Sequence, residues 1–259
     1  MKIKTATMVR VLAGMVMTGS VLGMMQPSSL AGDALSLDVS ADFATKYVWR
    51  GQLLTDAPVI QPSATLSGYG FSANVWGNVD ITDENEKNDE NLNLLETDYT
   101  LSYGFTPVEG LDLEGGLIWY TFPSLDSTGE VYASVTLSAV PLSPSLTVYY
   151  DFDEVEGFYA NLAVGHTMAL TEKLDFSLGA SLGWGDGDYH EFYFGQPASS
   201  SLSDILLSAC LDYALTERVS VSVYAAYSDF LDSDVEKLAR DGYGDSDILY
   251  AGVSLGVSF

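Results

Sequence analysis

The chain has 259 residues, of which 36 are acidic and 10 are lysine or arginine, so its formal net charge is −26 at pH 7. A chain this acidic repels phosphate backbones, which argues against a nucleic-acid partner and favours divalent ions or cationic solutes. Its one cysteine, Cys210, rules out an intrachain disulfide.

The N-terminal segment has the parts of a secretory signal. A basic start precedes an apolar run over residues 11–25, and small residues follow at 29–31. We predict a signal peptide at 1–31 and an outer-membrane β-barrel at 32–259. The apolar run is shorter than the roughly 20 residues that a helical span requires.

Apolar and polar residues alternate along the first mature segment, as in a strand with one lipid face and one wet face. A soluble β-sandwich would show the same period. The secretion signal and the aromatic residues near the expected strand ends favour a barrel. The expected lipid-facing residues are Leu35, Leu37, Val39, Ala41, Phe43, Tyr47 and Trp49.

Eleven further alternating runs follow, so we predict an all-β, single-chain, antiparallel up-and-down transmembrane barrel of about 12 strands, an even number as in bacterial barrels. Short connections should be periplasmic and long ones extracellular. The long loops are expected at 51–58, 82–91, 122–129, 186–201 and 229–247. The further strands are expected at 60–69, 71–81, 93–105, 111–121, 131–140, 146–152, 158–168, 174–184, 205–213, 219–227 and 248–259.

The N-terminal part of the mature chain also carries a recognisable motif. An aromatic-x-x-Arg-Gly segment contains Tyr47, Trp49, Arg50 and Gly51, a proline-containing second strand follows, and the third strand has Trp76 next to Gly77. This segment resembles the opening of the TorF-like family of outer-membrane porins. The resemblance implies an outer-membrane porin and does not imply a particular solute.

The wet face supplies the expected pore-lining residues. A surplus of carboxylates there would favour cations in a narrow aqueous path, whereas ion pairs could instead close the interior. A barrel of about 12 strands lies between filled barrels of about eight strands and open ones of 16 to 18. The expected pore-lining residues are Asp38, Asp42, Lys46, Arg50, Glu96, Asp98, Asp112, Glu114, Asp151, Asp175 and Asp212.

Lys46 and Arg50 are the two cations expected to point inward. They are about 13 Å apart along a regular strand. They could pair across the lumen or form a local selectivity element. Arg50 could also anchor the first loop through Asp56 in a two-pronged ion pair, or contact the solute directly.

The outer loops are acidic and carry one aromatic cluster. Their carboxylates lack the spacing of an EF-hand, so we expect association with lipopolysaccharide through divalent ions and no dedicated metal site or cofactor. The loop at 186–202 contains Tyr189, Phe192, Tyr193 and Phe194. This cluster could bind a partner or fold into the lumen as a plug.

We therefore predict a porin for passive diffusion of small hydrophilic solutes that prefers cations and lies in the outer membrane of a Gram-negative cell. The alternatives are a structural or adhesive barrel and, less favoured, a lipid-modifying enzyme. His166 and His190 lack a neighbouring serine and carboxylate, and no Gly-x-Ser-x-Gly motif is present. Terminal Phe259 is the expected signal for the barrel-assembly machinery, and the sequence leaves the oligomeric state open.

Overall fold

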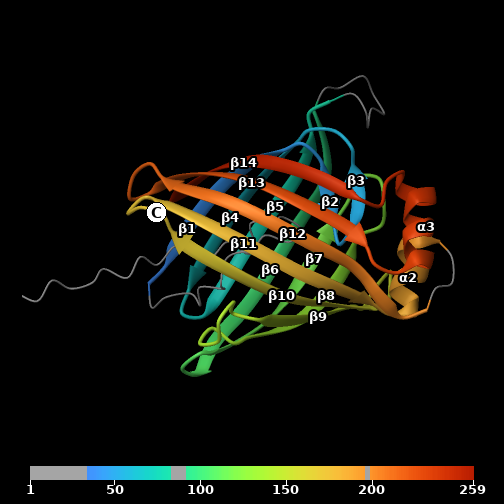
Figure 1. Cartoon of the computed structure of the whole chain (residues 1–259), viewed down its shortest axis with the longest axis horizontal. Coiled ribbons are helices and arrows are strands. Elements are labelled where there is room, and N and C mark those ends of the chain that lie inside the picture. The colour runs from blue at the N-terminus through green and yellow to red at the C-terminus, as the bar shows by residue number, and fades with distance from the viewer. Residues whose placement is uncertain (1–33, 83–91, 196–198) are drawn as a thin grey trace, which may run out of the picture.

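The computed structural model describes residues 34–82, 92–195 and 199–259. The predicted signal peptide and the acidic stretch at 83–90 lie outside the described residues. The described chain forms a closed barrel in which every strand pairs antiparallel with its neighbours (Figure 1). A separate hairpin of two short strands, β2 and β3, accompanies the barrel.

Twelve strands make the barrel, which confirms the predicted fold class. Strand β1 pairs with β4 along one edge and with β14 along the other, so the sheet has no free edge. The barrel strands are β1 (Ser36–Ala44), β4 (Val59–Gly68), β5 (Phe71–Asp80), β6 (Asn93–Val108), β7 (Leu111–Thr121), β8 (Thr128–Thr136), β9 (Ser145–Asp151), β10 (Phe158–Ala169), β11 (Leu174–Gly185), β12 (Ser201–Ala214), β13 (Val219–Phe230) and β14 (Ile248–Ser258).

The two faces of the barrel differ in polarity in the sense expected of a membrane protein. On β1, Val39 and Phe43 are 40% and 46% exposed on the outside, whereas Asp42 between them is fully buried inside. A soluble sandwich would bury the apolar set, so the burial pattern resolves the ambiguity that the period-two alternation leaves. The residues of this segment that are expected to face lipid are exposed on the outside: Leu35, Leu37, Val39, Ala41 and Phe43.

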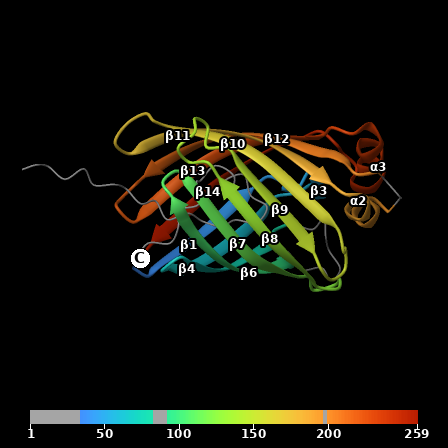
Figure 2. The same ribbon diagram turned by 90° about the horizontal axis from the view of Figure 1, so that it is seen from below.

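The two ends of the barrel are unlike each other. Both termini of the sheet meet at the end of tight turns, where backbone hydrogen bonds join Leu37 and Phe259. We call this the turn end, and the opposite end, which carries the helices, the loop end (Figures 1 and 2). Aromatic pairs lie near both ends: exposed Phe71 packs on exposed Tyr103 at the turn end, and half-buried Tyr150 packs on exposed Phe158 at the loop end.

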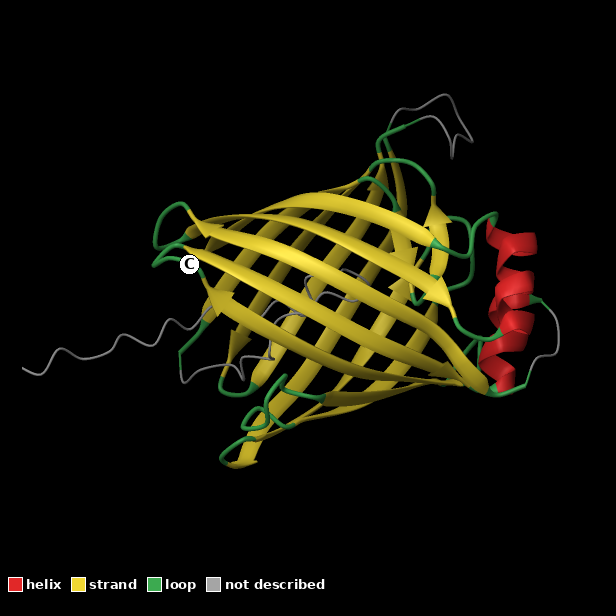
Figure 3. Cartoon of the chain, in the orientation of Figure 1, coloured by secondary structure: helices red, strands yellow, loops and turns green. Residues whose placement is uncertain are grey.

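Two predicted loops contain helices, α2 (Gly187–Phe194) and α3 (Ser233–Tyr243). Each begins after an aspartate, Asp186 or Asp232, whose side chain accepts hydrogen bonds from backbone N–H groups of the first turn. Figure 3 shows both helices across the loop end. Among the described residues, no helix is both long and apolar enough to cross a membrane.

The first predicted strand ends sooner than expected. Strand β1 stops at Ala44, and the chain then forms the hairpin of β2 (Tyr47–Trp49) and β3 (Gln52–Thr55). Tyr47 and Trp49 are only 3% and 9% exposed, so the prediction that they face lipid is wrong. The predicted long loop at 51–58 is correspondingly wrong, because it contains β3 and folds inward.

The reason is the turn between β2 and β3. Arg50 and Gly51 have φ values of 46° and 82°. Positive φ at both central positions is the geometry of the two-residue hairpin turn that matches strand twist. The chain therefore reverses at Arg50 and returns beside itself, and the alternation along the sequence does not reveal that reversal.

Candidate functional site

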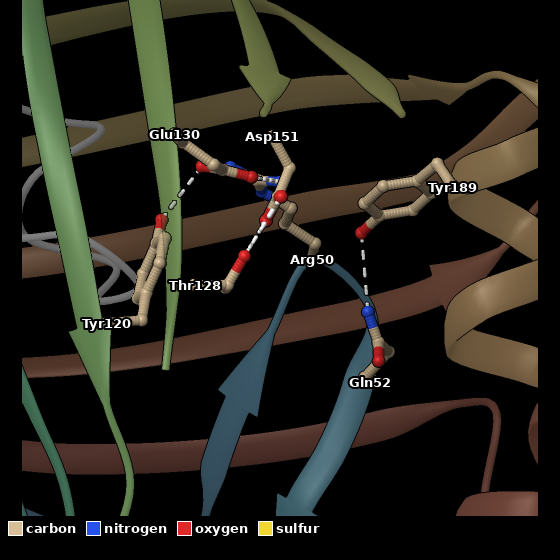
Figure 4. A network of polar contacts seen from close by, with 7 residues as sticks. All are labelled: Arg50, Gln52, Tyr120, Thr128, Glu130, Asp151 and Tyr189. Atoms are coloured by element: carbon tan, nitrogen blue, oxygen red, sulfur yellow. Dashed lines mark hydrogen bonds and ion pairs between the residues drawn. The ribbon is translucent and has the colours of Figure 1, made fainter. Parts of the chain in front are cut away.

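The hairpin places Arg50 inside the loop end of the lumen. Its two terminal nitrogens donate hydrogen bonds of 2.8 and 2.7 Å to the two carboxylate oxygens of Glu130 on β8 (Figure 4). Both side chains are almost completely buried. A two-pronged pair of this kind fixes the orientation of the guanidinium as well as its position.

Aromatic rings surround the same guanidinium. The Cζ atom of Arg50 lies 4.4 Å from the ring centroid of Trp49, 4.4 Å from that of Tyr149 and 4.3 Å from that of Tyr159. The ring of Tyr189 on α2 is 5.9 Å away. These distances are within the range of cation–π attraction, which strengthens when the cation is removed from water.

The electrostatic surroundings keep Arg50 charged. Burial by itself lowers the pKa of the guanidinium, but the carboxylate of Glu130 outweighs burial, and the pKa lies well above the ordinary value. The guanidinium therefore carries its positive charge inside the lumen.

A second set of hydrogen bonds ties the hairpin to the helices. Gln52 on β3 donates to the hydroxyl of Tyr189 at 3.3 Å and accepts from the hydroxyl of Tyr243 at 2.7 Å. Tyr243, at the end of α3, also lies 2.8 Å from the carbonyl oxygen of Tyr193. The hairpin, α2 and α3 thus form one connected assembly, which we call the mouth assembly.

Glycine allows this close packing at two positions. A Cβ atom on Gly51 would lie 2.9 Å from Cβ of Asp204, and a Cβ on Gly185 would lie 2.5 Å from Nε2 of His190. Both distances are shorter than real Cβ contacts, so larger residues would displace the hairpin or α2.

The expected anchor of the first loop has different partners. Lys46 forms the ion pair with Asp56, and Arg50 pairs with Glu130, so the predicted contact between Arg50 and Asp56 is wrong. Of the two proposed arrangements for the inward cations, pairing across the lumen is the one that Arg50 adopts. Lys46 is partly exposed and pairs within its own loop.

Several expected pore-lining carboxylates accept hydrogen bonds from hydroxyl or backbone N–H groups. Asp151 accepts hydrogen bonds from Thr128 and from the backbone N–H groups of Asp153 and Val155, so it shapes the β9–β10 turn. The other bonded carboxylates accept from hydroxyls: Asp38 from Ser258 at 2.6 Å, Asp112 from Thr106 at 2.6 Å, Glu114 from Tyr132 at 2.5 Å and Asp212 from Ser222 at 2.5 Å.

The other expected residues lie on inward positions in three groups. Glu96 and Asp98 are buried on β6, two positions apart on the same face, and Asp42 is buried on β1. Asp175 on β11 lies directly opposite Asp212 on β12. That the expected pore-lining residues line an open path stays a prediction.

Two residues of the sequence motif lie on β5. Trp76 is buried against Tyr47, at a ring-centroid distance of 5.6 Å, and Gly77 follows it in the strand.

Sequence reasoning missed Glu130 and Asp204. Glu130 falls between a predicted loop and a predicted strand, and Asp204 directly precedes the predicted start of another strand. Both residues belong to strands that begin earlier, at Thr128 and Ser201. Extending the period-two pattern backward by a few residues would have placed both carboxylates inside the barrel.

The two histidines occupy unrelated places. His190 is buried in α2, with Nδ1 3.0 Å from the carbonyl oxygen of Ser199, and burial lowers its pKa. His166 is exposed on β10. Within the described ranges, no group of three or more His, Cys, Asp or Glu side chains is arranged to hold a metal ion.

This closed barrel, with an apolar outside, an acidic inside and an inward-folded hairpin, defines a porin-like transmembrane β-barrel. A family model described as MltA-interacting protein MipA matches residues 37–237, and the chain belongs to that family. The match does not confirm the resemblance to the TorF-like family. No curated protein matches the sequence.

Solved outer-membrane barrels share the fold. The NanC porin superimposes with a TM-score of 0.53 at 15% identity, covering 86% of this chain and 98% of the porin. The KdgM porin gives a TM-score of 0.53 at 13% identity, covering 86% and 99%. An outer membrane channel from Pseudomonas putida F1 gives 0.54 at 8% identity, covering 91% and 100%. At these identities the likeness concerns the fold.

Proposed function

We propose that this protein is an outer-membrane porin that allows passive diffusion of small hydrophilic solutes and prefers cations. The observation that carries the proposal is the acidic inner face of a closed transmembrane barrel. The fold shared with porins and channels supports it, and it gives no support to an enzymatic activity.

The proposed orientation places the loop end outside the cell and the turn end in the periplasm, since bacterial barrels have short periplasmic turns. Phe259 is then exposed at the periplasmic end, where the barrel-assembly machinery would recognise it. At the outer end, exposed loop carboxylates would associate with lipopolysaccharide through divalent ions. Asp186 and Asp232 contribute less to this association, because they cap helices.

The proposed cation preference follows from charge pairing. The described ion pairs neutralise both inward cations, Lys46 by Asp56 and Arg50 by Glu130. Asp175 and Asp212 face each other across neighbouring strands, and like charges in that position repel. A hydrated cation path would relieve this repulsion and would exclude anions.

A second candidate is a structural barrel that does not conduct. The hydrogen-bonded mouth assembly favours it, because the hairpin and both helices close over the loop end. The family description adds a binding partner, MltA, to this candidate. In this role the barrel would be an anchor for a partner protein, and the lumen would carry no solute.

Single-channel recording in a planar bilayer tests the proposal. We expect discrete channel events and a reversal potential in a salt gradient that indicates cation preference. Folded barrels that insert without channel events would favour the structural role. Channels that prefer anions would contradict the assigned selectivity and leave the porin function in place.

A further inference from the structure

The groups that hold Arg50 form a cage that belongs mostly to the barrel. Glu130, Tyr149 and Tyr159 stand on β8, β9 and β10, and Tyr189 stands on α2. Only Trp49 comes from the same hairpin as Arg50. Arg50 therefore reaches these groups from a separate segment of the chain, and Figure 4 shows its side chain directed at Glu130.

The cage keeps its shape through contacts that do not involve Arg50. Glu130 accepts a hydrogen bond of 2.9 Å from the hydroxyl of Tyr120. Tyr159 donates to Asp204 at 3.1 Å. Tyr149 packs on Tyr132, with ring centroids 5.6 Å apart. A site held in place in this way is preorganised, so a ligand would bind it without the free-energy cost of ordering these side chains.

The chemistry of the cage selects one class of cation. Aromatic faces attract cations generally, but a carboxylate that accepts two parallel N–H bonds matches the planar fork of a guanidinium. An ammonium is a compact point charge and cannot form that pair. The cage thus distinguishes guanidinium from ammonium groups of the same charge.

Three rings of the cage belong to a row of four tyrosines inside the barrel. Tyr132, Tyr149, Tyr159 and Tyr189 follow one another with ring-centroid distances of 5.6, 6.2 and 5.3 Å. Glu114 accepts a hydrogen bond from Tyr132 at one end of this row. A planar cation bound in the cage would stack on rings of this row.

Arg50 is held in the cage at some cost in backbone conformation. Its φ of 46° is unfavourable for a residue with a side chain. We propose that the cage is a binding site for a guanidinium group carried by a solute, and that Arg50 occupies the site until the solute displaces it. This inference rests on the proposed porin function for the route of the solute and names its class.

The test measures binding of ethylguanidinium to detergent-solubilised protein by calorimetry. We expect Arg50→Ala to bind it at least about tenfold more tightly than the wild type, in which Arg50 occupies the cage. Ethylammonium should bind Arg50→Ala at least about tenfold more weakly than ethylguanidinium, because it lacks the fork. Adding Glu130→Gln should abolish the difference between the two ligands.

Controls separate the site from general electrostatics and from misfolding. Arg240→Ala removes an arginine from the same end of the barrel and should bind like the wild type. If Arg50→Ala does not fold, Arg50→Gln retains more of the side chain and has the same expected result. Equal binding of both ligands, or unchanged binding in the double variant, would overturn the proposal.

The outcome is independent of conduction because the binding assay needs no bilayer. If Arg50→Ala binds ethylguanidinium but no variant gives channel events, the cage is supported as a binding site and the porin function is contradicted. If channel events occur without selective binding, the porin function is supported and the proposed binding site is refuted.

Discussion

The loop end and the turn end of the lumen are built from the same alternating strands, yet their charged side chains have different kinds of partner. At the loop end, bulky rings and Glu130 enclose Arg50, and the inward cation is fully neutralised. Toward the turn end, Asp38 and Asp212 accept hydrogen bonds from Ser258 and Ser222. A hydroxyl group carries no charge that could balance a carboxylate. The comparison teaches that the loop end balances its inward arginine with a buried carboxylate, whereas these two carboxylates toward the turn end have uncharged partners.

The largest effect should come from removing the carboxylate at the loop end. Glu130→Ala leaves a buried guanidinium without its partner, which costs about 3–5 kcal/mol. We expect the hairpin to leave its position and the unfolding temperature to fall. Glu236→Ala breaks the exposed pair with Arg240 and should cost less than about 1 kcal/mol. Equal losses in the two variants would show that the loop end is no better organised than the surface.

Close packing of α2 gives the next largest effect. Gly185→Ala places a Cβ against the ring of His190 and should destabilise the mouth assembly by about 1–3 kcal/mol. Gly165→Ala is the matched control, because its Cβ would meet only an ordinary contact at 3.5 Å. Thermal unfolding followed by circular dichroism compares the two. A larger loss in the control would contradict the assigned packing.

Neutralising a carboxylate near the turn end tests the other half of the comparison. Asp175→Asn removes the repulsion with Asp212, so we expect a gain of about 0.2–1 kcal/mol in the free energy of unfolding. Cation preference, measured from reversal potentials at low salt, should fall. Asp126→Asn changes an exposed loop and should leave selectivity almost unchanged. Equal shifts in both variants would mean that overall charge, not the lumen, sets the preference.

The smallest effect concerns pH at the loop end. Burial lowers the pKa of His190 below its ordinary value of 6.5, although Ser199, Asp232 and Asp186 partly oppose the shift. The folded protein then binds fewer protons at this site than the unfolded chain does. His190 therefore costs no stability above a pH of about 6.5, and the free energy of unfolding declines as the pH falls below that value. Unfolding curves at stepwise lower pH should decline less steeply for His190→Gln. Parallel curves for wild type and variant would exclude this contribution.

Much of the barrel could be predicted from local patterns. The twelve strands and the outward position of Val39 and Phe43 follow from a period-two alternation that every strand repeats. The candidate site could be predicted only in part. The sequence predicts Arg50 as an inward cation, but it offers only the nearby Asp56 as an ion-pair partner, because local patterns do not report contacts between distant strands.

The amino-acid sequence by itself determined the closed antiparallel barrel and the polarity of its faces, since alternation reports which side of a strand each residue occupies. Only the tertiary structure decided that Tyr47 and Trp49 turn inward on a hairpin and that Arg50 meets Glu130, 80 positions away. The bond between Gln52 and Tyr243 spans 191 positions. Such contacts depend on how the whole sheet closes, and that closure brings together residues whose local patterns carry no information about one another.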